Sequence, residues 1–182
     1  MAQVQGVTKT GTLKTVFVTE DGELIVRAIT ETEIEHASGE GKAFSWDSKE
    51  LDIDAGDTIL FVQRTGDVSL VIDRVEISGS NVICTWEINL GRDSTTATGT
   101  GVSAVSLNTA FDGSTADARA FSDETAVADG DTVARVKTAV SGHVTVDMVG
   151  VILGKNHYIQ INQETESTSG SVIVHGHFLP VA

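Results

Sequence analysis

The chain has 182 residues, of which 26 are acidic and 12 are lysine or arginine, so its formal net charge at pH 7 is −14. A charge of this sign argues against binding nucleic acid or an anionic membrane through broad electrostatic attraction. The lone cysteine, Cys84, cannot form an internal disulfide, and no apolar run in the sequence is long enough to predict a membrane span. Eighteen glycines, a single proline and frequent Thr, Ser and Val favour many short strands joined by tight turns.

The first forty residues are predicted to form an arm, a hairpin and a linker. Residues 1–12 are polar and lack periodicity, which predicts a flexible arm, and they lack the charged and apolar regions of a signal peptide. An Asp-Gly pair between two β-rich runs predicts a hairpin in which residues 15–19 pair with residues 23–29. Because a two-stranded ribbon is at best marginally stable alone in water, this hairpin has to dock on another surface. The predicted anchor residues of this assembly element are Val16, Phe17, Val18, Asp21, Gly22, Leu24, Ile25 and Val26.

Residues 30–42, TETEIEHASGEGK, lose the β pattern and gain charge and glycine, which is typical of a linker. The chain therefore divides into residues 1–40, an arm and hairpin with a linker, and residues 41–182, a separate domain. Short strands without a long helix predict an all-β fold for this domain, an antiparallel β-sandwich of jelly-roll or related Greek-key type. The predicted strands are residues 43–47, 58–64, 68–78, 82–90, 102–108, 132–140, 144–153, 157–162 and 171–179.

Two of these strands carry more detailed predictions. In residues 82–90 the alternation places Cys84 and Trp86 on one face, which we assign to the core. In residues 68–78 the apolar phase shifts near Asp73 and Arg74, which indicates a β-bulge or a strand covered on both faces. Residues 111–131 are interpreted as an acidic insertion with at most one weak helical turn, and loops this long at one end of a sandwich tend to be contact surfaces.

The last predicted strand has apolar residues on both faces. Val172, Val174 and Phe178 share one face, which we assign to the core. The other face would need a partner, so we predict a homo-oligomer, with a trimer favoured. The predicted oligomer face consists of Ile173, His175, His177 and Leu179.

His175 and His177 are also the strongest metal candidates, since a His-x-His pair on one strand face can share a metal ion. No third ligand lies nearby in sequence, so the alternatives are ordinary surface or interface histidines and a site completed by another chain. We expect folding and function to require neither a metal nor another cofactor.

Other chemical patterns in the sequence have simpler structural explanations. The carboxylates in residues 47–57 could supply oxygen ligands for calcium, but their order does not match an EF-hand loop and also suits a solvated strand edge. Residues 99–104, GTGVSA, superficially fit a dinucleotide-binding glycine pattern, but a β-rich segment follows where that pattern needs a helix. No catalytic residues are predicted, and we expect the protein not to be an enzyme. The aspartates in residues 47–57 are Asp47, Asp52, Asp54 and Asp57.

Three segments of the chain form a recognisable combination: VTEDGELIV, GDTILFVQRTGDVSLVIDRVEIS and GVILGKNHYIQINQETESTSGSVIVHGHF. Together they resemble structural proteins of tailed-phage virions, in particular small head-decoration or auxiliary capsid proteins. The resemblance implies a β-sandwich that oligomerises, often as a trimer, and decorates or stabilises the outside of the capsid. It implies the major capsid protein or another virion protein as partner, assembly in the host cytoplasm and location in the virion. The negative charge fits a position away from the packaged genome, with no nucleic acid or membrane partner.

Two other functions remain open from the sequence. A tail-fibre, baseplate or lectin-like module would recognise a receptor or glycan through loops at the sandwich end, and exposed aromatic residues there would favour it. The aromatic residues that flank the acidic insertion are Phe111 and Phe121. An enzyme on a cupin-like jelly roll would require a clustered metal triad, whereas the only histidines close together in the sequence are His175 and His177.

Overall fold

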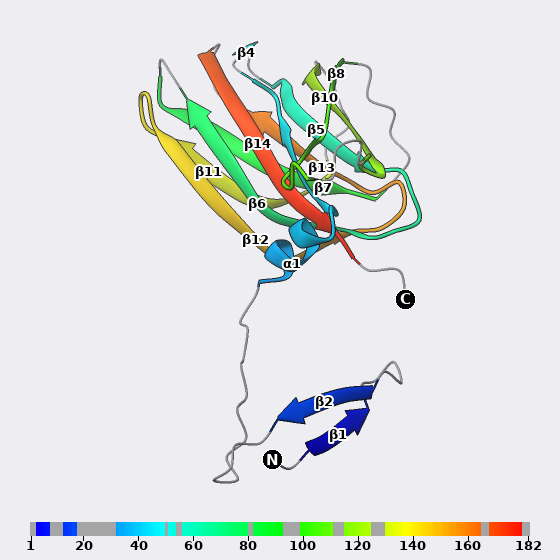
Figure 1. Ribbon diagram of the computed structural model, residues 1–182. Helices are drawn as coiled ribbons and strands as arrows, with labels where there is room; N and C mark the ends of the chain where they lie inside the picture. Colours follow the sequence, from blue (N-terminus) through cyan, green and yellow to red (C-terminus); the bar gives the residue numbers. More distant parts are fainter. Residues whose placement is uncertain are drawn as a thin grey trace. The chain divides into compact units, whose positions relative to one another are not determined.

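The computed structural model describes residues 3–7, 13–17, 32–49, 51–53, 56–79, 82–92, 99–110, 115–124, 130–164 and 168–179. The chain forms two compact units, residues 1–31 and residues 32–182. In the first unit, β1 (Gln3–Val7) and β2 (Leu13–Phe17) form a two-stranded antiparallel sheet. The second unit is an antiparallel β-sandwich with one short helix among its described residues, which confirms the predicted fold class (Figure 1).

The N-terminal sheet uses different residues from the predicted hairpin. Residues 3–7, which we expected to be part of a flexible arm, pair with residues 13–17 in the register Gln3 to Phe17. The prediction of a flexible arm was wrong. The segment QVQGV contains only two β-favouring residues, both valines, so its sequence pattern is weak. Pairing with the β-rich segment LKTVF decides its conformation. Residues 23–29, the predicted partner of residues 15–19, lie outside the described part of the chain.

The segment predicted as a linker contains the helix α1 (Glu33–Gly39). The Thr32 hydroxyl accepts a hydrogen bond from the Glu35 amide at 3.3 Å, and the Glu35 carboxylate accepts one from the Thr32 amide at 2.8 Å, which together form a capping box. At the other end, Gly41 adopts a φ of 71°, and the Lys42 amide donates to the Ala37 carbonyl. This is a Schellman motif, in which glycine avoids the steric cost of a left-handed residue. Both ends of α1 are therefore encoded locally.

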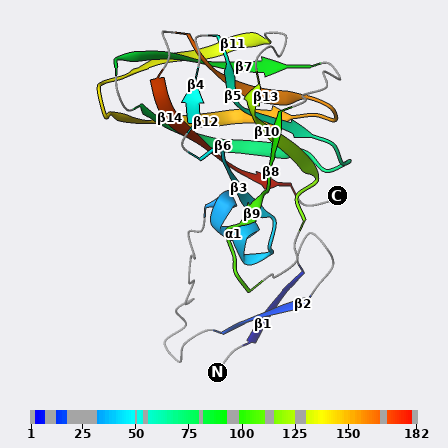
Figure 2. The ribbon, with the colours of Figure 1, turned by 90° about the horizontal axis from the view of Figure 1, so that it is seen from above.

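The described strand pairs of the two main sheets are all antiparallel. Figure 2 shows the sandwich from above. One sheet has the strand order β11-β7-β13-β5-β10-β8, and the other has the order β12-β6-β14-β3-β9, with β4 paired to β14. The first sheet consists of β11 (Asp131–Thr138), β7 (Cys84–Gly91), β13 (Tyr158–Gln163), β5 (Thr58–Arg64), β10 (Ala118–Glu124) and β8 (Thr100–Val102). The second consists of β12 (His143–Leu153), β6 (Leu70–Gly79), β14 (Thr168–Phe178), β3 (Ala43–Asp47), β9 (Val105–Ser106) and β4 (Leu51–Ile53).

The core lies between the two sheets and contains both tryptophans. Trp86 and Cys84 are fully buried, as predicted. The Trp86 indole Nε1 donates to the Thr138 hydroxyl at 3.0 Å. A Cβ atom at Gly170 of β14 would lie 3.0 Å from a Trp86 ring carbon, so glycine lets the ring reach across to the opposite sheet.

The predicted bulge in residues 68–78 is confirmed at Asp73. On the β14 side of β6, His175 pairs with Arg74 and Gly176 pairs with Ile72, so Asp73 is the extra residue. The bulge shifts the alternation and keeps Ile72 and Val75, three positions apart, in the core.

The acidic insertion was incorrectly predicted to lack a strand. Residues 118–124 form β10, which pairs with β5 on one side and β8 on the other. The segment ARAFSDE has few apolar positions, and the buried strand β5 beside it decides its conformation. Phe121 packs against the cluster of Phe61 and Tyr158 rather than standing free at a loop tip. Phe111 lies outside the described residues. None of the described helices is long and apolar enough to cross a membrane.

Candidate functional site

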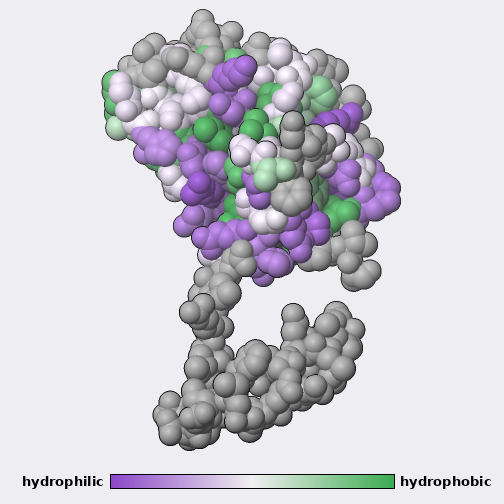
Figure 3. Space-filling view, in the orientation of Figure 1, coloured by the Kyte–Doolittle hydropathy of each residue, from purple (hydrophilic) through white to green (hydrophobic). Residues whose placement is uncertain are grey.

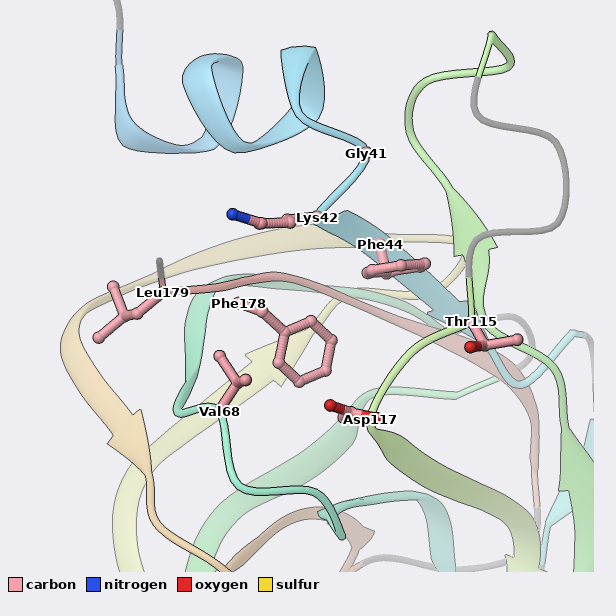
Figure 4. A pocket seen from close by; sticks show the side chains of 8 residues that line it. All are labelled: Gly41, Lys42, Phe44, Val68, Thr115, Asp117, Phe178 and Leu179. Carbon is pink, nitrogen blue, oxygen red and sulfur yellow. The ribbon is translucent and has the colours of Figure 1, made fainter. Parts of the chain in front are cut away.

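A cavity of about 230 Å³ lies at the end of the sandwich next to α1 (Figure 4). We call it the end cavity. Four separate segments of the chain meet there: the turn after α1 with β3, the segment before β6, the segment before β10, and the end of β14. Its lining residues are Gly41, Lys42, Phe44, Val68, Thr115, Asp117, Phe178 and Leu179.

Backbone hydrogen bonds hold these segments together. The Phe178 amide donates to the Lys42 carbonyl at 3.0 Å, and the Leu179 amide donates to the Ser69 carbonyl at 3.0 Å. The amides of Thr65 and Gly66 both donate to the Asp117 carbonyl. The approach at Gly66 is close, since a Cβ atom there would lie 2.5 Å from the Asp117 side chain.

The walls of the end cavity are mostly apolar. Phe44 and Phe178 pack edge to face with their ring centroids 5.7 Å apart, and Val68 and Leu179 add aliphatic surface. Both rings are nearly buried and belong to the main core, so the core itself supplies a rigid wall of the cavity.

The charged groups at the end cavity point in different directions. In Figure 4 the Asp117 carboxylate points toward Phe178 and Val68, whereas the Lys42 amine points away from the cavity. The Lys42 amine donates to the Glu40 carboxylate at 2.7 Å, and this hydrogen bond lowers the pKa of Glu40 below its usual value. Among the described residues, no cation forms an ion pair with Asp117. The end cavity therefore combines aromatic surface with one unneutralised carboxylate.

Two further cavities lie at opposite edges of the sandwich. An edge groove of about 510 Å³ lies between β3 and β8, and none of the described residues that line it is aromatic. A seam cavity of about 290 Å³ lies where β11 and β12 run along the other edge, with Val133 and Ile152 in its rim. Among their described lining residues, neither space combines a phenylalanine, tyrosine or tryptophan ring with a carboxylate.

The predicted histidine pair lies on the face of β14 that is turned away from the core. The His175 Nε2 atom is 3.3 Å from the Glu76 carboxylate, and the His177 Nδ1 atom is 3.0 Å from the Asp73 carboxylate. Burial lowers the pKa of His175 below its usual value, and the nearby Arg74 lowers it further against the opposite effect of Glu76. In the described ranges, no group of three or more His, Cys, Asp or Glu residues is placed to hold a metal ion.

The predicted oligomer face is only partly open. His177 is 3% exposed, and its Nε2 atom lies 3.9 Å from the Glu33 carboxylate of α1. Ile173 and His175 are half-buried, and Leu179 lines the end cavity. Figure 3 shows this side of the sandwich, where hydrophilic residues gather around α1. Part of the face for which we predicted a partner is thus covered by the chain's own helix.

The remaining predicted residues are dispersed. Val16 and Phe17 lie in β2, whereas Val18, Asp21, Gly22, Leu24, Ile25 and Val26 lie outside the described residues. Asp47 is exposed at the end of β3 and accepts from the Lys49 amide at 2.8 Å. Asp52 lies in β4, Asp57 precedes β5, and Asp54 lies outside the described part.

A layer of buried polar residues was not predicted from the sequence. It lies on the face of β7, β13 and β5 that is turned away from the other sheet, where register pairs Glu87 with Asn162 and Asn89 with Gln160. Glu87 forms an ion pair with Arg135, and the Thr58 hydroxyl donates to the Asn162 side-chain oxygen at 2.9 Å. Alternation along residues 82–90 places Glu87 and Asn89 on the face opposite Trp86, but the sequence gives no sign that this second face is buried.

No protein-family model, no curated protein and no solved structure matches this chain. We therefore infer its function from its own residues and their geometry.

Proposed function

We propose that this chain is a structural protein of a viral particle, in particular of a tailed phage, whose β-sandwich decorates or stabilises the exterior of the capsid. The observation that carries the proposal is the division into a sandwich and a separate two-stranded unit. Two strands of five residues bury too little surface to be stable alone in water. The unit formed by β1 and β2 is therefore the attachment element, and the major capsid protein or another virion protein is its partner.

The sandwich has the properties of an assembly module. Exposed apolar residues occur along its β11 and β12 edge, where Val133, Val149 and Ile152 are 47%, 91% and 55% exposed. Exposed apolar groups on edge strands favour contacts with other subunits. These residues, together with the open part of the β14 face, support the proposal of a homo-oligomer. The trimer is favoured because the resemblance to capsid-decoration proteins implies it.

The charge of the chain supports an outer location. A net charge of −14 repels the packaged genome, whereas a role on the capsid exterior requires no attraction to nucleic acid. The proposed location is the virion, after assembly in the host cytoplasm.

Co-purification with virus particles tests the proposal. Particles from a lysate that contains the native protein are banded in a density gradient and washed, and the protein is quantified by mass spectrometry. We expect the protein in the particle band at a constant ratio to the major capsid protein. Its absence from washed particles, with all of it free in the supernatant, would contradict a structural role in the virion.

A further inference from the structure

We propose that the end cavity binds a cationic side chain, arginine or lysine, that is presented by a partner protein. The inference is independent of the virion proposal, because it concerns the chemistry of one cavity in the sandwich. It would hold for any partner that packs against the α1 end of this unit.

The size of the end cavity favours a single side chain. Its volume of about 230 Å³ is below the roughly 300 Å³ at which pockets for small-molecule ligands begin. A long unbranched side chain fits such a space better than a compact metabolite, since its backbone remains outside with the partner.

The polarity of the end cavity selects the kind of side chain. Phe44, Phe178, Val68 and Leu179 supply apolar surface for the methylene groups of lysine or arginine, which pack on such surfaces while the charged head stays near polar groups. Aromatic rings also attract cations within about 6 Å of the ring centroid. Asp117, whose carboxylate points into the space, provides the opposite charge.

The neighbouring charges favour a cation over an anion. Among the described lining residues, Lys42 is the only basic one, and its amine donates to the Glu40 carboxylate at 2.7 Å and points away from the cavity. Asp117 has no ion-pair partner among the described residues, so an incoming cation would not have to displace one. The net charge of −14 adds a long-range attraction for a basic partner.

Titration of the intact protein with side-chain probes tests this proposal. The probes are N-acetyl-arginine amide, N-acetyl-lysine amide and the neutral N-acetyl-norleucine amide, followed by NMR signals of Phe44, Phe178, Val68 and Leu179. We expect both cationic probes to shift these signals with a dissociation constant on the order of 1 to 10 mM and the neutral probe to bind more weakly. Binding of the cationic probes should also weaken as salt is added.

Asp117→Asn, with Asp147→Asn as the matched control, isolates the carboxylate. Both substitutions remove one negative charge from an exposed residue and keep the side-chain shape, but Asp147 lies in β12 and does not line the end cavity. We expect Asp117→Asn to weaken binding of the cationic probes roughly two- to fivefold and Asp147→Asn to leave it unchanged.

Several results would overturn the proposal. Equal affinity for the neutral probe would show that the carboxylate selects nothing, and equal weakening by both variants would show a general charge effect. Signals that shift with protein concentration alone would identify a second copy of the chain as the occupant. Binding that appears only after residues 180–182 are deleted would show that the chain fills its own cavity.

Discussion

Gly91 and Tyr158 show at the residue scale how one missing side chain determines packing. They are register partners on β7 and β13, and a Cβ atom at Gly91 would overlap the Tyr158 ring. The ring is 1% exposed and packs against Phe61 with centroids 4.8 Å apart, so it has little room to move.

We therefore expect Gly91→Ala to destabilise the protein by about 1–3 kcal/mol, the usual cost of overpacking a close-packed site. The matched control is Gly101→Ala, since a Cβ atom at Gly101 in β8 meets no other atom within 4 Å. Urea unfolding of both variants measures the difference. Equal stability of the two variants would contradict the packing described for Tyr158.

The lowered pKa of His175 leads to a second prediction, which concerns the dependence of stability on pH. Its folded-state pKa is lowered, chiefly by burial, so the unfolded chain holds the His175 proton more tightly than the folded chain does. The free energy of unfolding should therefore decrease as pH falls below about 6.5, the usual histidine value. We expect His175→Gln to show a shallower decrease between pH 8 and pH 5 than the parent protein. Parallel curves for the two proteins would contradict this assignment.

At the scale of elements, α1 is a short helix that depends on its ends. Seven residues are too few for a stable isolated helix, so its two end motifs and its packing against β3 and β14 have to stabilise it. Ala37 is buried in this contact, and Glu33 lies near the buried His177.

Thr32→Ala tests whether α1 is an integral part of the sandwich. The substitution removes the hydroxyl that accepts from the Glu35 amide, and it should lower the free energy of unfolding by about 1 kcal/mol. Glu35→Gln keeps a side-chain acceptor for the Thr32 amide and should cost less. Chemical unfolding of both variants provides the measurement. An unchanged stability of Thr32→Ala would mean that residues 32–40 behave as the linker that their composition suggested.

Elements with a strong sequence pattern of their own were predicted, and elements with a weak pattern were not. The bounds of β3 and β5 were predicted correctly, because their β-rich segments are bordered by turn residues. The bulge at Asp73 was visible as a phase shift in the apolar pattern. By contrast, β1 and β10 have weak patterns of their own and depend on the strands beside them. The signals for α1 were present in Thr32, Glu35 and Gly41, but a charged seven-residue helix has no apolar stripe to reveal it.

The end cavity could not be predicted for a different reason. Lys42, Val68, Asp117 and Phe178 are far apart in the sequence, and only the strand order brings them together. The histidine pair was visible as a motif, yet its contacts with Asp73, Glu76 and Glu33 depend on the bulge and on α1.

At the scale of the whole molecule, the exposed apolar residues on the β11 and β12 edge lead to a prediction of oligomeric state. We expect light scattering at micromolar concentration to give a mass near three times the 19.1 kDa of one chain. Val149→Lys, which places a charge at the most exposed of these positions, should shift the mass toward one chain without unfolding the sandwich. If the parent protein has the mass of one chain, the prediction of an oligomer is contradicted.

The division of the chain into two units has the largest consequence for function. Residues 32–182 contain the sandwich, its core and α1, so deletion of residues 1–31 should change the melting temperature by less than about 2 °C, equivalent to under ~1 kcal/mol. We propose that the removed unit attaches the sandwich to a virus particle.

Cryo-electron microscopy of particles incubated with the full chain or with the chain that lacks residues 1–31 tests this claim most directly. We predict ordered density at the capsid exterior for the full chain and bare particles for the truncated chain. Melting curves should show that both proteins are folded. Full occupancy by the truncated chain, or bare particles with the full chain, would contradict it.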